Sequence, residues 1–302
     1  AQLIAVKAPK GCGKTQWLQW LTAPQISSGE RRTLLITHRI QLGLQTTNRL
    51  GIPFVSQLKD TEQGSLFGYG LCIDSLHPQS QAKFTPREWR GAWVIIDEIQ
   101  QVIWHLLSSS TCQKERVVII KTLKELLQTV VETGGKIFLC DADLNDIAIE
   151  FIEGLLGYSP ERFLLVNEFK FNDFWTIYKF GGKNPAGMIA ELEHRLQNGE
   201  KALLCVSGQK AKSRWGTQVL EEHFKRKYPT LKILRIDSES VANPEHEAFG
   251  CTENLNKVVV NYDLVVSSPT VETGVSIDVQ HFNGVWLIGQ GVQTADGVRQ
   301  FL

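Results

Sequence analysis

The chain has 302 residues, of which 42% are hydrophobic and 21% are charged, a composition typical of globular proteins and not of disordered or fibrous chains. Lys and Arg together number 32, and so do Asp and Glu. The net charge therefore favours neither a nucleic acid nor a membrane as partner, and any basic binding surface must be local. The length allows about two domains of ~150 residues each. No apolar run approaches the ~20 residues that span a bilayer, and no secretory signal opens the chain.

The six cysteines and seven histidines are scattered, without the spacing of a zinc site. This pattern favours a reducing cytoplasm and free thiols. Met188 is the single methionine, the first residue is alanine, and a helical pattern is cut off at Leu302. We therefore expect the chain to be an excised fragment of a longer protein.

Short apolar segments alternate with amphipathic ones, which is typical of parallel α/β architecture. The expected strands are Leu3–Lys7, Thr33–Thr37, Trp93–Asp97, Lys136–Cys140, Phe163–Val166, Trp175–Phe180, Ala202–Val206, Leu231–Arg235, Leu264–Ser267 and Gly284–Ile288. The expected helices are Lys14–Thr22, Arg39–Leu50, Glu98–Leu107, Lys114–Thr133, Asn145–Leu156, Pro185–Gln197 and Ser213–Lys227. A polar turn near residues 169–174 predicts a boundary between two domains, 1–170 and 171–302.

The strongest motif is a glycine-rich segment between the first expected strand and the first expected helix. It comprises Ala8, Pro9, Lys10, Gly11, Cys12, Gly13, Lys14 and Thr15. Its backbone N–H groups and the helix N-terminus can bind phosphate oxygens, so residues 10–15 are candidate cofactor-binding residues. We expect Lys14 to reach the β- and γ-phosphates and the Thr15 hydroxyl to ligate Mg²⁺. Ala8 stands where the strict pattern has glycine, a departure that many helicase-type loops tolerate. The alternative is a glycine-rich turn before a helix that happens to include Gly-Lys-Thr.

A second motif, Val-Ile-Ile-Asp-Glu, ends in Asp97 and Glu98. An apolar strand that ends in two acids places both carboxylates at the carboxyl edge of a parallel sheet, where α/β proteins bind ligands. Asp97 would hold Mg²⁺, and Glu98 would orient or deprotonate the attacking water. The alternative is that these acids only cap the following helix.

With both motifs in place, the chain resembles superfamily 2 helicases, and Asp97-Glu98-Ile99-Gln100 resembles their second nucleotide motif. Further motifs follow in the expected order: Thr37-His38-Arg39, the segment 72–77 with Asp74 and Ser75, Cys140-Asp141-Ala142-Asp143, and the segment 267–278 with Glu272, Thr273 and Gly274. Segments 72–77, 104–112 and 281–286 add a similarity to the helicase portion of cyanobacterial plasmid replication proteins. In that family a primase region usually precedes the motor.

The resemblance implies two RecA-like P-loop lobes with mainly parallel sheets, helices on both faces, and ATP and Mg²⁺ as cofactors. It implies single-stranded DNA or a replication origin as partner, contacted by Thr37, His38, Arg39, Asp74, Ser75 and Thr273. Asp141, Asp143 and Glu272 would couple the lobes, and Gly274 would contact the nucleotide. Gln300 fits the start of a late catalytic motif that contains arginines. Because the chain stops two residues later, we expect weak ATP turnover from it.

A further candidate surface follows the strand expected at Ala202–Val206. It comprises Ser207, Gly208, Lys210, Lys212, Arg214 and Trp215. The cations would bind phosphates and the indole would stack on a base. A solvated helix start explains the same charges, just as simple helix caps or turns explain the segments at Thr37, Asp143 and Glu272.

Three functions compete at this stage. The leading one is an ATP-driven motor that moves on single-stranded DNA through closure of two lobes. The second is a nucleotide-dependent switch or scaffold for replication that has a helicase fold but does not unwind DNA. The third, a phosphotransferase, is disfavoured by the Thr273-Gly274 segment.

Overall fold

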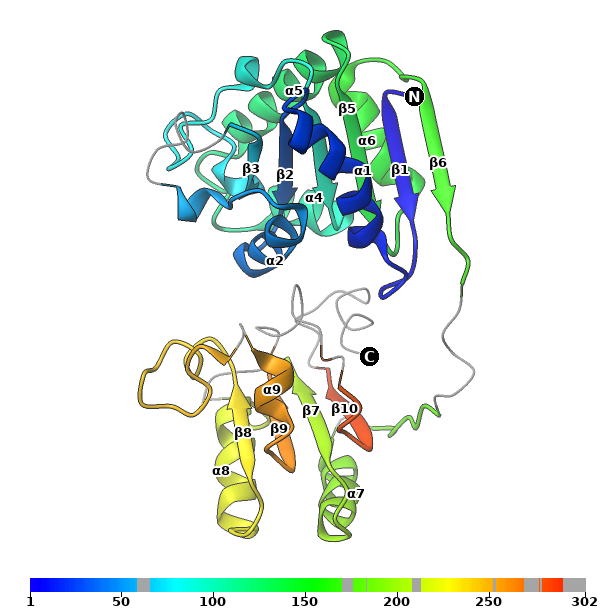
Figure 1. Cartoon of the computed structure of the whole chain (residues 1–302). Coiled ribbons are helices and arrows are strands. Elements are labelled where there is room, and N and C mark those ends of the chain that lie inside the picture. The colour runs from blue at the N-terminus through cyan, green and yellow to red at the C-terminus, as the bar shows by residue number, and fades with distance from the viewer. Residues whose placement is uncertain are drawn as a thin grey trace. The chain divides into compact units, whose positions relative to one another are not determined.

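The computed structural model describes residues 1–58, 66–169, 176–182, 184–207, 213–251, 254–268, 277 and 279–289. The chain forms two compact units, Ala1–Asp173 and Phe174–Leu302, each with its own parallel sheet (Figure 1). The glycine-rich motif at residues 8–15 and the acidic motif at residues 97–98 both belong to the first unit.

The first unit contains a six-stranded sheet in the order β3-β2-β4-β5-β1-β6. Its strands are β1 (Leu3–Lys7), β2 (Thr33–Thr37), β3 (Gly68–Cys72), β4 (Trp93–Asp97), β5 (Lys136–Asp141) and β6 (Arg162–Val166). Its helices are α1 (Lys14–Ser28), α2 (Ile40–Leu50), α4 (Ile99–Ser108), α5 (Arg116–Glu132) and α6 (Asp146–Leu156), with short 3₁₀ turns at Val55–Gln57, Ile73–Ser75 and Pro86–Trp89. Every pairing in this sheet is parallel.

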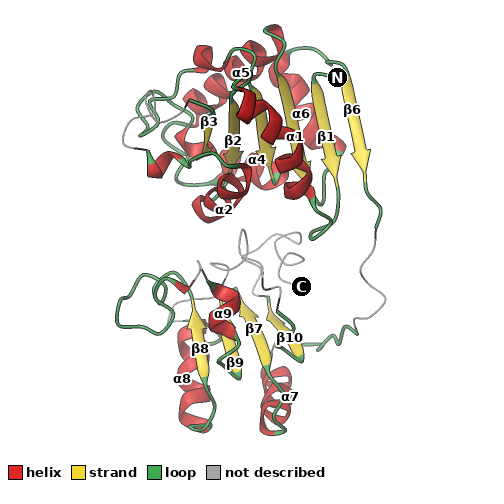
Figure 2. Cartoon of the chain, in the orientation of Figure 1, coloured by secondary structure: helices red, strands yellow, loops and turns green. Residues whose placement is uncertain are grey.

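Helices cover both faces of this sheet because alternate strand residues point to opposite sides. On one face, strand residues such as Ile36 and Ile96 pack with Leu106 of α4, Leu126 of α5 and Ile152 of α6. On the other face, residues such as Leu35 and Ile95 pack with Leu18 of α1 and Leu50 of α2. Figure 2 shows these helices on the two sides of the sheet.

The second unit repeats this arrangement with a four-stranded parallel sheet in the order β10-β7-β9-β8. Its strands are β7 (Ala202–Val206), β8 (Ile233–Ile236), β9 (Leu264–Ser267) and β10 (Gly284–Ile288). Helices α7 (Ala186–Gln197) and α8 (Thr217–Lys227) pack on one face, and α9 (Leu255–Val259) packs on the other. The predicted α/β class, with parallel sheets and helices on both faces, is confirmed.

Some predicted elements differ from the structure. The strand predicted at Trp175–Phe180 is wrong over residues 176–180, which form no strand and expose Ile177 and Tyr178 by 82% and 72%. Strand β3 is missing from the prediction because its glycines weaken the strand pattern. Helix α1 continues past the predicted end at Thr22 to Ser28 with Pro24 inside it, and the predicted strand Leu231–Arg235 begins instead at Ile233.

Gly68, the first residue of β3, has a positive φ of 108°, and a Cβ built there would lie 1.9 Å from the Thr33 carbonyl oxygen. We expect Gly68→Ala to lower the free energy of unfolding by about 3 kcal/mol or more, because backbone strain adds to a clash with backbone. Gly154→Ala in α6 is the matched control, since an added Cβ meets no atom within 4 Å there. Chemical denaturation of both variants checks this, and equal stability of the two would contradict it.

Candidate functional site

Five of the motifs meet at one edge of the first sheet. In parallel strands the carboxyl ends lie at the same edge, and the register places Lys7 of β1 beside Asp141 of β5. Asp97 of β4 pairs with Cys140, and Thr37 of β2 pairs with Cys72 of β3. The phosphate-loop candidate and the acidic motif are therefore brought together with the segment around Asp141.

The segment after β1 folds as a tight loop that leads directly into α1. Gly11 and Gly13 both have positive φ, 79° and 80°, a conformation that glycine adopts without steric cost. Gly13 is the N-cap of α1, and no side chain caps this helix within the described chain. The Lys14 ammonium donates to the Ala8 carbonyl at 2.7 Å. This arrangement leaves a helix N-terminus, glycine backbone and one ammonium to bind an anion.

Three carboxyl groups lie beside this loop and interact with one another. Burial raises the pKa of Asp97 to about 6 against the opposing charge of Lys14, and the Asp141 carboxylate acts in the same direction as burial. Burial also raises the pKa of Glu98 to about 8, with Asp97 and Asp141 acting in the same direction. Burial likewise raises the pKa of Asp141. Carboxyls with perturbed pKa values that cluster around one lysine are typical of a catalytic site.

Glu98 is held in an unusual backbone conformation. It has φ 54° and ψ 56°, the left-handed region that costs a non-glycine residue about 1–2 kcal/mol. Its Oε2 atom is buried and has no hydrogen-bond partner in the described part of the chain. A strained acid with an unpartnered buried oxygen needs a polar group that the protein does not supply, such as a water molecule.

The donors at this edge suit a hard cation. A threonine hydroxyl at position 15 and the carboxylate of Asp97 are oxygen ligands of the kind that Mg²⁺ prefers, with substrate phosphates and water completing the set. Within the described ranges, no group of three or more His, Cys, Asp or Glu side chains is arranged to hold a metal ion. The residues present therefore fit a metal that is bound together with a phosphate ligand.

A hydrogen-bond network connects the acidic motif to the segment after β5. The Asp141 carboxylate accepts from the backbone N–H of Asp143 and of Gln100, each at 2.9 Å. The Gln100 side-chain amide donates to the Asp143 carbonyl, and Asn145 donates to the Gln100 Oε1 atom at 3.4 Å. A displacement of either segment would therefore move the other.

The network also contains residues to which the sequence assigns no role. Gln100 belongs to the quoted acidic motif, but nothing in its spacing reveals that it bonds to Asp143. Thr46 of α2 donates to the Asp97 carboxylate at 3.4 Å, and no local pattern marks it. Asn145 accepts from the Ala148 N–H at 3.1 Å as the cap of α6. This bond agrees with the alternative that the segment around Asp143 simply caps a helix.

The residues after β2 and β3 differ in their exposure. Thr37 is fully buried, and His38 is only 6% exposed. Burial lowers the pKa of His38 to about 3, with Arg39 and His105 acting in the same direction. Its imidazole is therefore neutral and offers no charge to a phosphate. Arg39, the third residue of the motif, is half-buried and keeps a guanidinium at the same edge.

Asp74 and Ser75 form part of the 3₁₀ turn after β3. Asp74 lies 3.8 Å from the His105 ring of α4, and this imidazole lowers the pKa of the Asp74 carboxyl below its ordinary value. The rings of His38 and His105 are 6.4 Å apart between centroids. The segments after β2, β3 and β4 thus contact one another beside the nucleotide candidates.

In the second unit, the structure describes three of the predicted nucleic-acid residues. Ser207 follows β7 and is buried, whereas Arg214 is exposed and stacks over the half-buried Trp215 at 5.4 Å from the ring centre. Trp215 packs against the core of α7 and α8, so only part of its ring is exposed for stacking on a base. The other predicted residues, Gly208, Lys210, Lys212, Glu272, Thr273, Gly274 and Gln300, lie outside the described residues.

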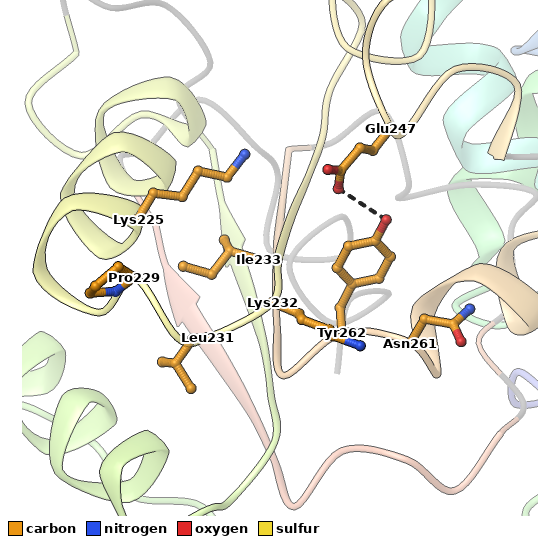
Figure 3. Close-up of a pocket in the computed structure, with 8 residues that line it drawn as sticks. All are labelled: Lys225, Pro229, Leu231, Lys232, Ile233, Glu247, Asn261 and Tyr262. Atoms are coloured by element: carbon orange, nitrogen blue, oxygen red, sulfur yellow. Dashed lines mark hydrogen bonds between the residues drawn. The ribbon is translucent and has the colours of Figure 1, made fainter.

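A hollow of about 530 Å³ lies elsewhere in the second unit. Its lining is drawn in Figure 3 and consists of Lys225, Pro229, Leu231, Lys232, Ile233, Glu247, Asn261 and Tyr262. The Tyr262 hydroxyl donates to Glu247 at 3.1 Å. Because Ile233 begins β8 and Tyr262 precedes β9, the hollow lies at the amino ends of these strands. It is therefore separate from the carboxyl-edge residues Ser207, Arg214 and Trp215.

The two units have the fold of RecA-like lobes seen in two solved helicase structures. The DNA-bound DUF1998 helicase MrfA matches 100% of this chain and 44% of its own with a TM-score of 0.63 at 14% identity. Mss116p bound to single-stranded RNA and AMP-PNP matches 95% of this chain and 60% of its own with a TM-score of 0.59 at 13% identity. No known protein-family profile matches the chain.

Two longer proteins are similar in sequence. An uncharacterised protein of Picosynechococcus sp. (strain PCC 7002) is 43% identical over 307 residues, which cover 100% of this chain and 30% of that protein. A protein of Acanthamoeba polyphaga mimivirus named "Putative replication origin-binding protein" is 23% identical over 298 residues, 94% of this chain and 33% of its own length. The chain thus spans about a third of these relatives. Among the described residues, no helix is long and apolar enough to cross a membrane.

Proposed function

We propose that the chain is an ATP-dependent motor that moves on single-stranded DNA during replication, with Mg²⁺ as the metal of the nucleotide. The observation that carries the proposal is the grouping of Lys14, Asp97 and Glu98 at one sheet edge, where the ammonium acts on both carboxyls. A loop with left-handed glycines at a helix N-terminus, opposite two acids, is the chemistry of nucleoside triphosphate hydrolysis. The helicase fold supports the same conclusion.

Each residue of the site has a separate proposed task. Residues 10–15 would bind the phosphates, with Lys14 leaving the Ala8 carbonyl to reach the β- and γ-phosphates. Thr15 and Asp97 would hold Mg²⁺, which supplies electrostatic stabilisation of the developing phosphate charge. Glu98 would orient the attacking water and accept its proton at Oε2, the oxygen that has no hydrogen-bond partner among the described residues.

The Gln100 network is proposed to connect nucleotide state with movement. Gln100 bonds to both Asp141 and Asp143, so a shift of the acidic motif on hydrolysis would be transmitted to the segment after β5. We propose that Asp141, Asp143 and Glu272 carry this shift to the second unit, and that Gly274 contacts the nucleotide and Gln300 takes part in catalysis. The order of the motifs and the RecA-like fold support this assignment.

The nucleic-acid grip is proposed for the carboxyl-edge segments of both units. In the first unit, Arg39 would supply the positive charge that binds phosphate. Thr37, Asp74 and Ser75 would fix the backbone conformation at this edge. His38 is neutral, so it would contribute no charge. In the second unit Ser207, Gly208, Lys210, Lys212, Arg214, Trp215 and Thr273 would bind the strand. Contacts to phosphates would make binding independent of base sequence and weaker in high salt.

The assignment to replication rests on the similarity to the viral protein named as a replication origin-binding protein. A nucleotide-dependent switch that clamps DNA without moving is the competing function. Superfamily 2 helicases often carry Ser-Ala-Thr where this chain has Asp-Ala-Asp at residues 141–143, and this difference favours the switch. The motor and the switch differ in one measurable property, because only a motor needs DNA to accelerate ATP turnover.

The test is phosphate release with and without single-stranded DNA, together with DNA affinity in ATP and in ADP. We expect DNA to accelerate turnover by about tenfold or more, and Gln100→Ala to lose this acceleration while still binding ATP. Gln128→Ala, on α5 away from the site, is the matched control. A nucleotide-dependent DNA affinity without acceleration would favour the switch. Absence of both responses would overturn both functions.

A further inference from the structure

Strand β6 ends the first sheet with an apolar edge that no described element of the unit covers. It pairs with β1 on one side and is the last strand of the sheet order (Figure 1). Phe163, Leu164 and Val166 are exposed by 51%, 53% and 48%. An exposed apolar edge strand can form backbone hydrogen bonds with another strand. We therefore expect this edge to bind a partner strand.

The hydrogen bonds to β1 show which backbone groups of β6 are available. The Leu3 N–H donates to the Glu161 carbonyl at 3.2 Å, and the Asn167 N–H donates to the Lys7 carbonyl at 2.8 Å. Odd-numbered residues therefore direct their backbone groups towards β1. Because backbone direction alternates along a strand, Arg162, Leu164 and Val166 present their N–H and C=O groups to the open edge.

We propose that the open edge of β6 pairs with β6 of a second copy of this chain, antiparallel about a two-fold axis at Leu165. This register places Leu164 opposite Val166 within β6, and it places Arg162 opposite Glu168, which lies two residues beyond the end of β6, in the other copy. The outward-facing backbone groups of Leu164 and Val166 therefore meet each other, which allows a hydrogen-bonded ladder along this part of the strand.

Charge complementarity selects this register and this occupant. Arg162 is 59% exposed and has a weak ion pair with Glu153 at 3.6 Å, and Glu168 is exposed. In the proposed register each end of the ladder joins an arginine to a glutamate across the two-fold axis. A shift by two residues, with the axis at Leu164, would set Arg162 opposite Val166 and lose both ion pairs. An isologous pairing of β6 with β6 also closes on itself, because it uses the open β6 edge of both copies.

The backbone direction permits a matched pair of proline variants. Leu164→Pro removes an N–H that faces the open edge, so pairing with β1 is retained. Phe163→Pro removes an N–H that faces β1, so it should destabilise the unit itself. In sedimentation equilibrium of the 302-residue chain we expect a concentration-dependent dimer. Leu164→Pro should raise its dissociation constant by about tenfold or more and keep the parent's unfolding midpoint.

Charge reversal tests the register. Arg162→Glu or Glu168→Arg alone places like charges opposite each other at both ends of the ladder, and we expect each to weaken the dimer by about tenfold. The double variant Arg162→Glu/Glu168→Arg restores both pairs and should return the dissociation constant to about the parent's value. A chain that stays monomeric, a Leu164→Pro variant that dimerises as tightly as the parent, or a double variant weaker than the single ones would overturn the proposal.

Discussion

Replacement of Lys14 by alanine is expected to lower ATP affinity and turnover by about 100- to 1000-fold. The ammonium is the cation at the N-terminus of α1 whose field lowers the pKa values of both Asp97 and Glu98. Without it, the triphosphate would meet two buried carboxyls with one compensating charge fewer, and removal of one preorganised donor typically costs that much in rate. Ligand-induced stabilisation measures the binding step directly, because ATP raises the unfolding temperature only if it binds the folded chain.

Lys121→Ala is the matched control for this prediction. Lys121 is an exposed residue of α5 outside the glycine-rich loop and the acidic motif, and its replacement should leave ATP binding unchanged. Lys14→Arg adds a second comparison, since it keeps the charge but changes the shape of the donor. If Lys14→Ala still gains thermal stability from ATP at the parent's concentration dependence, the loop is not a phosphate site and the motor function fails.

The sequence predicts the motif residues of the candidate site better than the neighbouring residues that contact them. Gly11, Gly13 and Lys14 can be recognised because the loop needs fixed residue types at fixed spacing, and Asp97 ends an apolar strand. The bond from Thr46 to Asp97 depends on how α2 packs across the sheet, which no local pattern encodes. The neutral state of His38 likewise follows from burial, which the sequence does not reveal.

In the fold, too, the elements with a clear local pattern are predicted and those that depend on tertiary packing are not. Strands such as β4 are uninterrupted apolar runs, which predict their burial in a parallel sheet. Strand β3 contains Gly68 and Gly70, whose positions are required because Thr33 and Thr47 approach their α-carbons closely. Tertiary packing, rather than strand propensity, therefore specifies β3. The exposed segment 176–180 has the opposite character: its composition is strand-like, and the Phe180 ring lies 6.3 Å from the Trp286 ring of β10, but the segment forms no strand.

Glu98→Gln is expected to bind ATP normally and to lose turnover by about 100- to 10,000-fold. The amide keeps the size of the side chain but cannot accept the proton of the attacking water, and removal of a general base has an effect of this size. The variant should therefore form a stable ATP complex, in contrast to Lys14→Ala. ATP-induced stabilisation and phosphate release, measured on the same samples, separate the two behaviours.

The same variant makes a prediction about stability and pH. The pKa of Glu98 is raised from 4.5 to about 8, so between these values the folded chain retains a proton that the unfolded chain has released. The free energy of unfolding must then fall as pH rises through this window. Glutamine carries no charge at any pH, so Glu98→Gln should be more stable than the parent at about pH 9, with the difference vanishing towards about pH 4.

Asp97 contributes a dependence of the same sign, because its pKa is also raised, to about 6. It is present in the parent and in Glu98→Gln alike, so the difference between their unfolding temperatures reports Glu98 together with its interaction with Asp97. Glu150→Gln on the exposed surface of α6 controls for the loss of any one negative charge and should show no such pH-dependent gain. A stability difference that stays constant from about pH 4 to about pH 9 would mean that Glu98 is ionised and solvated in the free protein. In that case the Glu98 carboxyl would not be buried, and its proposed role as the base would lose its structural support.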